Sequence, residues 1–381
     1  MKIEQRRWSE EMGWESKPLE PTQWGETVQL VLIFGDRLLL AKQELLDIIK
    51  TAYPNAYLLG CSTAGEIYDT EVSDEALVVT AVEFERTQIK GTCVNLLDVN
   101  NSFEIGEKLA RSLESDGLVH VFLLSEGIKI NGSDLVRGIT QHLPKGVTVT
   151  GGLSGDGANF QETSVLWRDR PHSDAVVALG LYGKHLKVGY GSWGGWDPFG
   201  PERIVTHSEG NILYKLDGKS ALGLYKQYLG AFAKELPASG LLFPLSLRIE
   251  SKDMPVVRTI LGVDEAKQSM TFAGDVPEGS TVRLMKANFD RLVDGAIEAA
   301  EKSYGVNGST APDLAILISC VGRKLVLKQR IEEEVEGVRE VMGDKTILTG
   351  FYSYGEISPF EEGVRCELHN QTMTITTLRE D

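Results

Sequence analysis

Cysteine and histidine are scarce in this chain of 381 residues, and neither type is spaced as in a metal site. The four cysteines form no CxxC pair, and the six histidines form no HxxxH or HExxH pattern. Scattered cysteines of this kind are typical of free thiols in a reducing compartment. A structural zinc site or a zinc-dependent hydrolase is therefore not expected.

Positive charge is also scarce. The chain has 39 Lys and Arg against 55 Asp and Glu, a formal net charge of −16 at pH 7. Nucleic acid and anionic membranes attract clustered Lys and Arg, so we expect neither as a partner. No run approaches the ~18 apolar residues of a membrane helix, and residues 1–24 lack the apolar core of a signal peptide. We expect a soluble, cytoplasmic protein whose first 24 residues form an N-terminal arm.

What the chain does contain is a repeated segment. Residues 58–67, LLGCSTAGEI, return near the other end as residues 348–357, LTGFYSYGEI. Each follows an apolar strand pattern, a loop and an amphipathic helix pattern, and a weaker third copy ends in GGLSGDG at 151–157. This glycine-rich stretch lacks the Lys-Ser of a P-loop. We predict an α/β fold of layered mixed sheets, built from two or three strand-loop-helix-strand units joined by antiparallel meanders.

Short strands with tight turns are predicted from about residue 175 onward. Among them, the segment Gly191 to Pro201 carries three aromatic residues between glycines and prolines, and we expect an irregular loop there. Such a loop either plugs the edge of a core or forms the wall or lid of a ligand pocket.

Several motifs follow one another in an order that is similar to one protein family. They are GCSTAGE at 60–66, GGLSGDG at 151–157, the stretch 194–218, SCVGR at 319–323, GFYSYGEI at 350–357 and LHNQT at 368–372. On these residues the chain resembles the FIST family of bacterial signal-transduction sensors over almost its whole length. The resemblance implies a FIST N-type domain at 25–219 and a FIST C-type domain at 220–381.

The resemblance further implies a non-enzymatic sensor that binds a small ligand, an amino acid or a similar metabolite being one candidate. It also implies a separate signalling partner, such as a histidine kinase or a cyclic-di-GMP enzyme, and leaves a homo-oligomer open. One branch of the family resembles haem-binding nitric-oxide sensors that regulate a partner kinase. Haem, held by His369 or His207, is therefore kept as an alternative. A second alternative is an enzyme that uses Cys61.

Candidate ligand-binding residues come from the three repeated turns, where carboxylates beside free backbone N–H groups suit a zwitterionic or hydroxyl-bearing ligand. These residues are Cys61, Ser62, Thr63, Glu66, Ser154, Asp156, Tyr352, Ser353 and Glu356. In the alternative interpretation each carboxylate caps its own turn or pairs with an arginine. The positions that match Cys61 are Gly152 and Phe351, which favours a buried structural thiol over a nucleophile.

Further candidates lie outside the turns. Trp193 and Trp196 are expected to cover the pocket. Arg323 either binds a ligand carboxylate or pairs with the acidic helix segment 332–334. His369 and Asn370 begin a run of four hydrogen-bonding side chains, which form either an internal network or a ligand contact.

Overall fold

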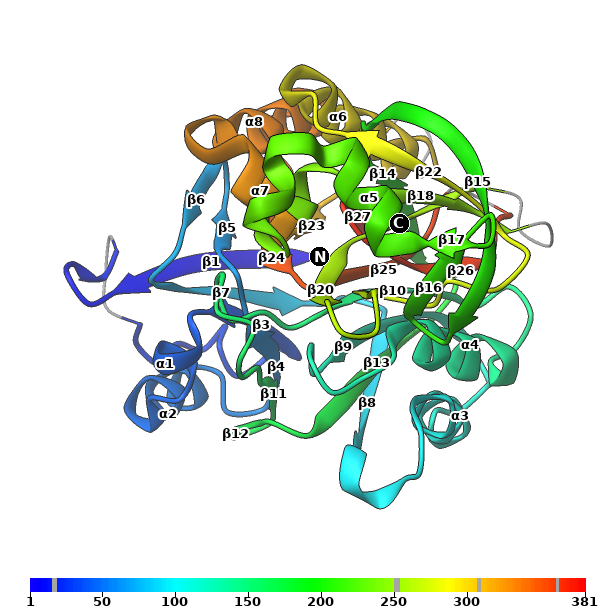
Figure 1. Cartoon of the computed structure of the whole chain (residues 1–381). Helices are drawn as coiled ribbons and strands as arrows, with labels where there is room; N and C mark the ends of the chain where they lie inside the picture. The colour runs from blue at the N-terminus through cyan, green and yellow to red at the C-terminus, as the bar shows by residue number, and fades with distance from the viewer. Residues whose placement is uncertain (16–18, 250–253, 307–309, 361–362) are drawn as a thin grey trace.

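A computed structural model of the chain describes residues 1–15, 19–249, 254–306, 310–360 and 363–381, so residues 16–18 of the expected arm lie outside it. The strands of the described residues form four sheets, accompanied by helices (Figure 1). The mixed α/β fold class predicted from the sequence is confirmed.

The first sheet has the strand order β12 (Arg170–His172), β11 (Val165–Trp167), β4 (Tyr57–Ser62), β3 (Leu30–Gly35), β7 (Ala76–Glu83), β1 (Lys2–Ser9) and β2 (Gly13–Trp14). The second sheet has the order β26 (Cys366–His369), β25 (Gly355–Pro359), β10 (Thr148–Leu153), β9 (Leu118–Ser125), β13 (Ala175–Tyr182) and β8 (Gln88–Asn95).

The third sheet has the order β14 (Leu186–Trp193), β27 (Met373–Glu380), β23 (Leu314–Cys320), β24 (Ile347–Ser353), β5 (Glu66–Tyr68) and β6 (Glu71–Ser73). The fourth sheet has the order β19 (Val256–Arg258), β18 (Leu245–Arg248), β22 (Thr281–Lys286), β15 (Asp197–Glu209), β16 (Ile212–Leu216), β21 (Ser269–Phe272) and β20 (Ile260–Asp264), and β17 (Lys219–Ser220) pairs with β16.

The α-helices are α1 (Arg37–Leu40), α2 (Gln43–Ala52), α3 (Ser102–Ser112), α4 (Gly132–His142), α5 (Ala221–Leu229), α6 (Phe289–Val306), α7 (Val321–Leu327) and α8 (Ile331–Met342). Short 3₁₀ turns are η1 (Leu96–Asp98), η2 (Gly230–Glu235), η3 (Ala238–Leu242) and η4 (Lys328–Arg330). Of the helices in the described part of the chain, none combines the length and apolar composition needed to cross a membrane.

The first three sheets enclose one shared apolar core. In β3 every second side chain, from Leu30 through Leu32 to Phe34, packs into this core, while Val31 and Ile33 pack on the other face against α2. A strand that is buried on both faces has a continuous apolar sequence, which is why such segments were predictable.

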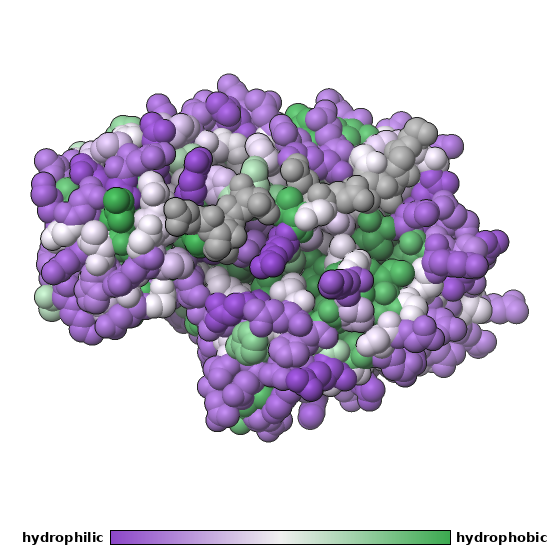
Figure 2. All heavy atoms as spheres, turned by 90° about the vertical axis from the view of Figure 1, so that its right-hand side faces the viewer, coloured by the Kyte–Doolittle hydropathy of each residue, from purple (hydrophilic) through white to green (hydrophobic). Residues whose placement is uncertain are grey.

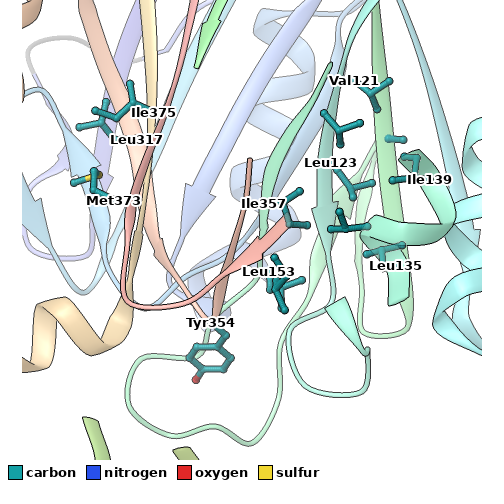
Figure 3. Close-up of a cluster of buried hydrophobic side chains, with 14 of the residues drawn as sticks. Val121, Leu123, Leu135, Ile139, Leu153, Leu317, Tyr354, Ile357, Met373 and Ile375 are labelled. Carbon is teal, nitrogen blue, oxygen red and sulfur yellow. The ribbon is translucent and has the colours of Figure 1, made fainter. Parts of the chain in front are cut away.

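Helices cover the outer faces of these sheets. Helix α2 covers the first sheet, α3 and α4 cover the second, and α6 and α8 cover the third (Figure 1). On the second sheet, Leu135 and Ile139 of α4 lie beside Val121 and Leu123 of β9 (Figure 3). The fourth sheet has its own core, which it shares with α5.

The three inner sheets use the same arrangement of strands. Each contains a parallel pair, β3 with β4, β9 with β10 and β23 with β24, and a third strand antiparallel to the first of the pair. The strand after each turn then joins another sheet: β5 pairs with β24, β25 pairs with β10, and β11 pairs with β4. This cyclic exchange interlocks the sheets. The descent of the units from one ancestor stays a prediction.

The expectation of an irregular loop from Gly191 to Pro201 is wrong for most of that segment. Its first residues belong to β14, and β15 begins at Asp197. A register shift between Phe199 and Arg203 lets the strand pass Gly200, whose φ is 75°. Such a bulge accommodates the glycine and prolines that argued against regular structure.

The N-terminal residues also form a strand, since β1 pairs with β7 along its length. The strands β1, β7 and β8 were not among those predicted from the sequence. Trp8, Trp14 and Trp24 pack against the core beneath α2.

The turn glycines are required by close contact between paired strands. A Cβ atom on Gly60, Gly151 or Gly350 would lie 1.7, 1.8 or 1.8 Å from the carbonyl oxygen of the directly opposite residue on the neighbouring strand. No side chain fits at such a distance. The glycines that the sequence repeats therefore fix how closely each parallel pair approaches.

We expect Gly350→Ala to destabilise the protein by about 1–3 kcal/mol or more, because the new methyl group must push β24 away from the Leu317 carbonyl group on β23. The matched control is Gly262→Ala, in the strand β20, where a Cβ atom would meet nothing within 4 Å. Urea unfolding should show a change of at most about 0.5 kcal/mol for this control. Equal effects of the two substitutions would contradict the close-contact explanation.

Candidate functional site

The three repeated turns meet and are joined by backbone hydrogen bonds. Ala64 N donates to Tyr352 O at 2.8 Å, Gly155 N donates to Ser62 O at 2.8 Å, and Tyr354 N donates to Leu153 O at 3.3 Å. Each turn is therefore bonded to both of the others. We expected these N–H groups to face a ligand, but at these three positions they donate to a carbonyl oxygen of another turn.

Glu66 and Glu356 occupy equivalent places in the first and last turns, and both are 0% exposed. Glu66 accepts hydrogen bonds from Thr63 Oγ1 at 2.5 Å and from Ala76 N at 3.2 Å. Glu356 accepts from Ser353 Oγ at 2.7 Å and from Thr372 Oγ1 at 2.9 Å. Glu66 thus ties its turn to the start of β7, and Glu356 ties its turn to the residue before β27. Burial raises the pKa of both groups to about 8, although these hydrogen bonds oppose the shift.

The remaining turn residues have local partners. Ser62 Oγ donates to Gly155 O, and Ser154 Oγ donates to Ser125 O. Asp156 does not match the two glutamates in environment, because it is 7% exposed and accepts from Arg37 Nε at 3.4 Å. The structure thus brings the three turns together, with Asp156 paired to Arg37.

Cys61 is 0% exposed and packs in the shared core of the three sheets. Burial raises the pKa of its thiol well above the ordinary value, which keeps it protonated. A nucleophilic cysteine needs the opposite shift and access to a substrate. This environment favours the interpretation of Cys61 as a structural thiol.

Arg323 forms a buried ion pair with Glu334 of the acidic helix segment. Both side chains are 0% exposed, and Nε and Nη2 donate to Glu334 Oε2 at 3.0 and 2.7 Å. Arg323 also donates to the carbonyl oxygens of Gly194 and Leu292, both at 2.6 Å. Tyr352 OH donates to the other Glu334 oxygen at 2.8 Å. Arg323 thus holds α7, α8, α6 and the Gly194 turn together, the second of the two roles expected for it.

The two tryptophans near Gly194 have different environments. Trp196 is 6% exposed, and its Nε1 donates to Gln371 O at 2.8 Å. Trp193 is half-buried, with Lys302 Nζ 4.2 Å from its ring centroid. Trp196 therefore seals the region around Gln371, and Trp193 lies at its margin.

The residues His369 to Thr372, here called the junction segment, connect β26 of the second sheet to β27 of the third. All are buried, although all have polar side chains. Four buried atoms of neighbouring side chains have no hydrogen-bond partner among the described residues. They are Asn370 Oδ1, Gln371 Nε2, Gln371 Oε1 and Ser192 Oγ. Because nearly all buried polar atoms in proteins are bonded, such a group requires an explanation.

Gln371 was not predicted as a site residue, although its motif was recognised. Its φ is 62°, and its side chain lies against Gly322, where a Cβ atom would be 2.4 Å from Gln371 Nε2. The run of four polar residues was the signal that could have identified it. Two other residues were missed entirely, Arg258 and Thr259, at the end of β19. Arg258 Nη1 donates to Leu368 O, directly before the junction segment, at 3.1 Å.

Neither histidine of the haem alternative is positioned to bind haem iron. His369 is 0% exposed, its Nε2 is 2.7 Å from Ser358 O, and its ring meets Phe360 edge-on with centroids 4.2 Å apart. His207 is at the surface, 2.9 Å from Glu278 and stacked on Tyr214. Haem needs an axial imidazole beside an apolar slot. Haem binding stays an untested prediction.

Two cavities stand out in the described part of the chain, and neither is lined by a predicted site residue. One, of about 10 Å³, lies between the three inner sheets and is lined by apolar side chains with His120 and Thr376. That volume is at the lower limit for one water molecule. The other, of about 320 Å³, is a surface depression lined by residues 21–26 and 51–54. In addition, the face where β15 and β26 lie is hollowed and gathers apolar residues (Figure 2).

Comparisons with known proteins support one family. Residues 29–219 match the FIST N domain, and residues 221–359 match the FIST C domain. An uncharacterized protein of Methanocaldococcus jannaschii is 22% identical over 319 residues, covering 77% of this chain and 60% of its own length. The crystal structure of a cyanuric acid hydrolase from A. caulinodans aligns at a TM-score of 0.17 and 10% identity, over 77% of this chain and 99% of that one. A likeness at this TM-score carries no argument.

We expect Arg323→Met to destabilise the protein by about 3–5 kcal/mol, because it leaves Glu334 buried without its cation. The control is Arg330→Met, which removes a surface arginine paired with Glu333 and Asp290 and should cost about 0–1 kcal/mol. Chemical unfolding of both variants measures the difference. An Arg323→Met variant as stable as the wild type would refute the structural role.

The two buried glutamates predict a pH-dependent stability. Their folded pKa of about 8 lies above the ordinary 4.5, so the folded state holds these protons more tightly than the unfolded state. The stability they provide is complete below pH 4.5 and is lost as the pH rises to about 8. The unfolding free energy should therefore fall from about pH 4.5 to about pH 8 and then level off, and most of this fall lies above the pI of about 5.0.

In the double variant Glu66→Gln and Glu356→Gln, which carries neutral side chains at both places, this fall should be much smaller. Glu340→Gln, at an exposed position on α8, serves as the control and should keep the wild-type profile. Urea unfolding at several pH values gives the comparison. The same slope in the double variant and the wild type would show that these carboxyl groups do not titrate in this range.

Proposed function

Because this chain belongs to the FIST family, whose domains are sensory, we propose that it is a non-enzymatic sensor whose ligand site lies at the junction segment. The ligand is a small polar molecule, an amino acid or a similar metabolite being the expected class. The signal passes to a separate partner, such as a histidine kinase or a cyclic-di-GMP enzyme, in the cytoplasm.

The observation that carries this proposal is the Gln371 side chain. Its amide is completely buried, and neither its nitrogen nor its oxygen has a hydrogen-bond partner among the described residues. An unsatisfied buried polar group costs about 1–3 kcal/mol. A protein tolerates that cost where the group has another use, and binding a polar ligand is such a use.

The position of the junction segment also supports a sensory role. Trp196, from the region matching the FIST N domain, bonds the main chain of Gln371, and Arg258, from the region matching the FIST C domain, bonds that of Leu368. The two matched regions also share sheets, since β5 pairs with β24 and β15 with β22. A ligand held here would contact both regions and thereby bias their packing. Ligand sites often lie at such interfaces.

A thermal-shift screen of amino acids and related metabolites tests the proposal with the variant Gln371→Met. Methionine has nearly the same shape but no amide, so this variant should be as stable as the wild type, or more stable, without ligand. A compound at 100 times its Kd should stabilise the wild type by about 2.7 kcal/mol and should not stabilise the variant. Gln141→Leu, at an exposed position on α4, is the control and should respond like the wild type.

Two results would count against the proposal. If Gln371→Met loses several kcal/mol of stability without any ligand, the amide serves packing instead of binding. If a compound shifts the melting temperature of the variant as much as that of the wild type, the ligand binds elsewhere.

A further inference from the structure

Among the described residues two arginines are completely buried, and they differ in their hydrogen-bond partners. Arg323 is paired with the carboxylate of Glu334. Arg258, at the end of β19, is 1% exposed and donates only to backbone carbonyl oxygens. Its Nε donates to Asp275 O at 3.2 Å, and its Nη1 donates to Val257 O and Leu368 O, both at 3.1 Å.

No carboxylate among the described residues is bonded to Arg258. Asp275 and Glu367 lie near enough to stabilise its charge at a distance, but the Asp275 carboxylate is bonded to Asn131 Nδ2 at 2.9 Å. These three hydrogen bonds of Arg258 come from Nε and Nη1. Burial lowers the pKa of this guanidinium to about 10, which leaves it charged at neutral pH. A buried cation of this kind is expensive unless an anion pairs with it.

Polar atoms without partners belong to residues next to Arg258 in the chain and to residues that follow its contact Leu368. Thr259, the next residue after Arg258, has a buried hydroxyl group without a partner among the described residues. On the opposite side, Leu368 O accepts from Arg258, and Asn370 and Gln371 follow directly with their own unpartnered atoms. Ser192 is linked to the junction segment through Phe360. Its N donates to Phe360 O, and the Phe360 ring packs on His369.

We infer that Arg258 and the junction segment form the binding site of a small carboxylate anion. Arg258 takes the carboxylate group, for which a guanidinium has matching geometry and permanent charge. Asn370 and Gln371 bond the other polar groups of the ligand. This assignment rests on the proposed sensory function and defines the chemistry of its ligand: an acid, recognised through its anionic group, rather than a neutral metabolite.

The closed position of Arg258 explains how binding is transmitted. Since the guanidinium is 1% exposed and bonded to Leu368 O of β26, we expect a ligand to reach it when β19 of the fourth sheet separates from β26 of the second. Strand β26 lies on the side of the molecule that is hollowed (Figures 1 and 2). Occupancy of the site therefore changes how the fourth sheet packs on the three inner sheets, which is a difference that a partner protein can recognise.

The test compares acids with their own amides on the full chain. Acetate and acetamide, alanine and alaninamide, and lactate and lactamide are titrated at millimolar concentration, with the melting temperature and calorimetry as readouts. We expect at least one acid to bind and its amide not to bind. Arg258→Met should weaken that binding ~10- to 100-fold, the loss expected for a charge-assisted hydrogen bond. Arg248→Met, at an exposed position on β18, should bind like the wild type.

The unliganded variants provide a second readout that does not depend on the ligand. If Arg258 serves binding, Arg258→Met without ligand loses clearly less stability than Arg323→Met, because carbonyl groups lose a donor but no carboxylate bonded to Arg258 is left buried without its cation. A large loss of stability, comparable to that of Arg323→Met, would instead show that Arg258 is structural and would overturn the inference. Arg258→Lys keeps the charge without the planar fork and should bind the acid with intermediate affinity.

Failure of this inference is distinguishable from failure of the proposed function. An amide that binds the wild type and Arg258→Met equally, and that Gln371→Met no longer binds, overturns the carboxylate site and leaves the sensory site in place. If no acid and no amide shifts the melting temperature of the wild type, both are overturned.

Discussion

The structure depends on the mutual hydrogen bonding of three glycine-bounded turns. Each turn ends a parallel pair of strands whose separation is fixed by a glycine, and each is bonded through its backbone to the other two. The strands that leave the turns then cross into neighbouring sheets. Because main-chain groups make these contacts, the requirement falls on backbone shape, which explains why glycines recur while Cys61 and Phe351 differ. The two buried glutamates complete the arrangement by tying the first turn to the start of β7 and the last turn to the residue before β27.

The buried polar groups of this fold are of two kinds: some are hydrogen-bonded within the fold, and others lack such partners among the described residues. Glu66, Glu356 and Arg323 are buried, and each is bonded to partners within the fold. Gln371 and Arg258 are equally buried, yet one lacks any partner for its amide and the other lacks a bonded carboxylate among the described residues. The proposed site combines these two groups, which are linked through the contact of Arg258 with Leu368. A region that stores unsatisfied polar groups at an interface is also a region that a ligand can reorganise.

Much of the fold could be predicted from the sequence, since the buried parallel strands read as continuous apolar runs ending in glycine. The candidate turns were recognised because their motifs repeat, and the pairing of Arg323 with the acidic helix was one of two roles foreseen. Arg258 could not be found in this way. It lies in an ordinary strand pattern, and its contact with Leu368 joins residues 110 positions apart. The strand through Asp197 was missed because a bulge tolerates the glycine and prolines that usually end a strand.

The central claim is that the junction segment and Arg258 hold a small acid. The most direct measurement is a crystal structure of the full chain with the acid that gives the largest thermal shift. The account predicts density for a carboxylate within hydrogen-bonding distance of the Arg258 guanidinium, with other polar atoms of the ligand bonded to Asn370 or Gln371. Density that shows the acid at another place, with water or protein atoms beside Arg258 and Gln371, would contradict it.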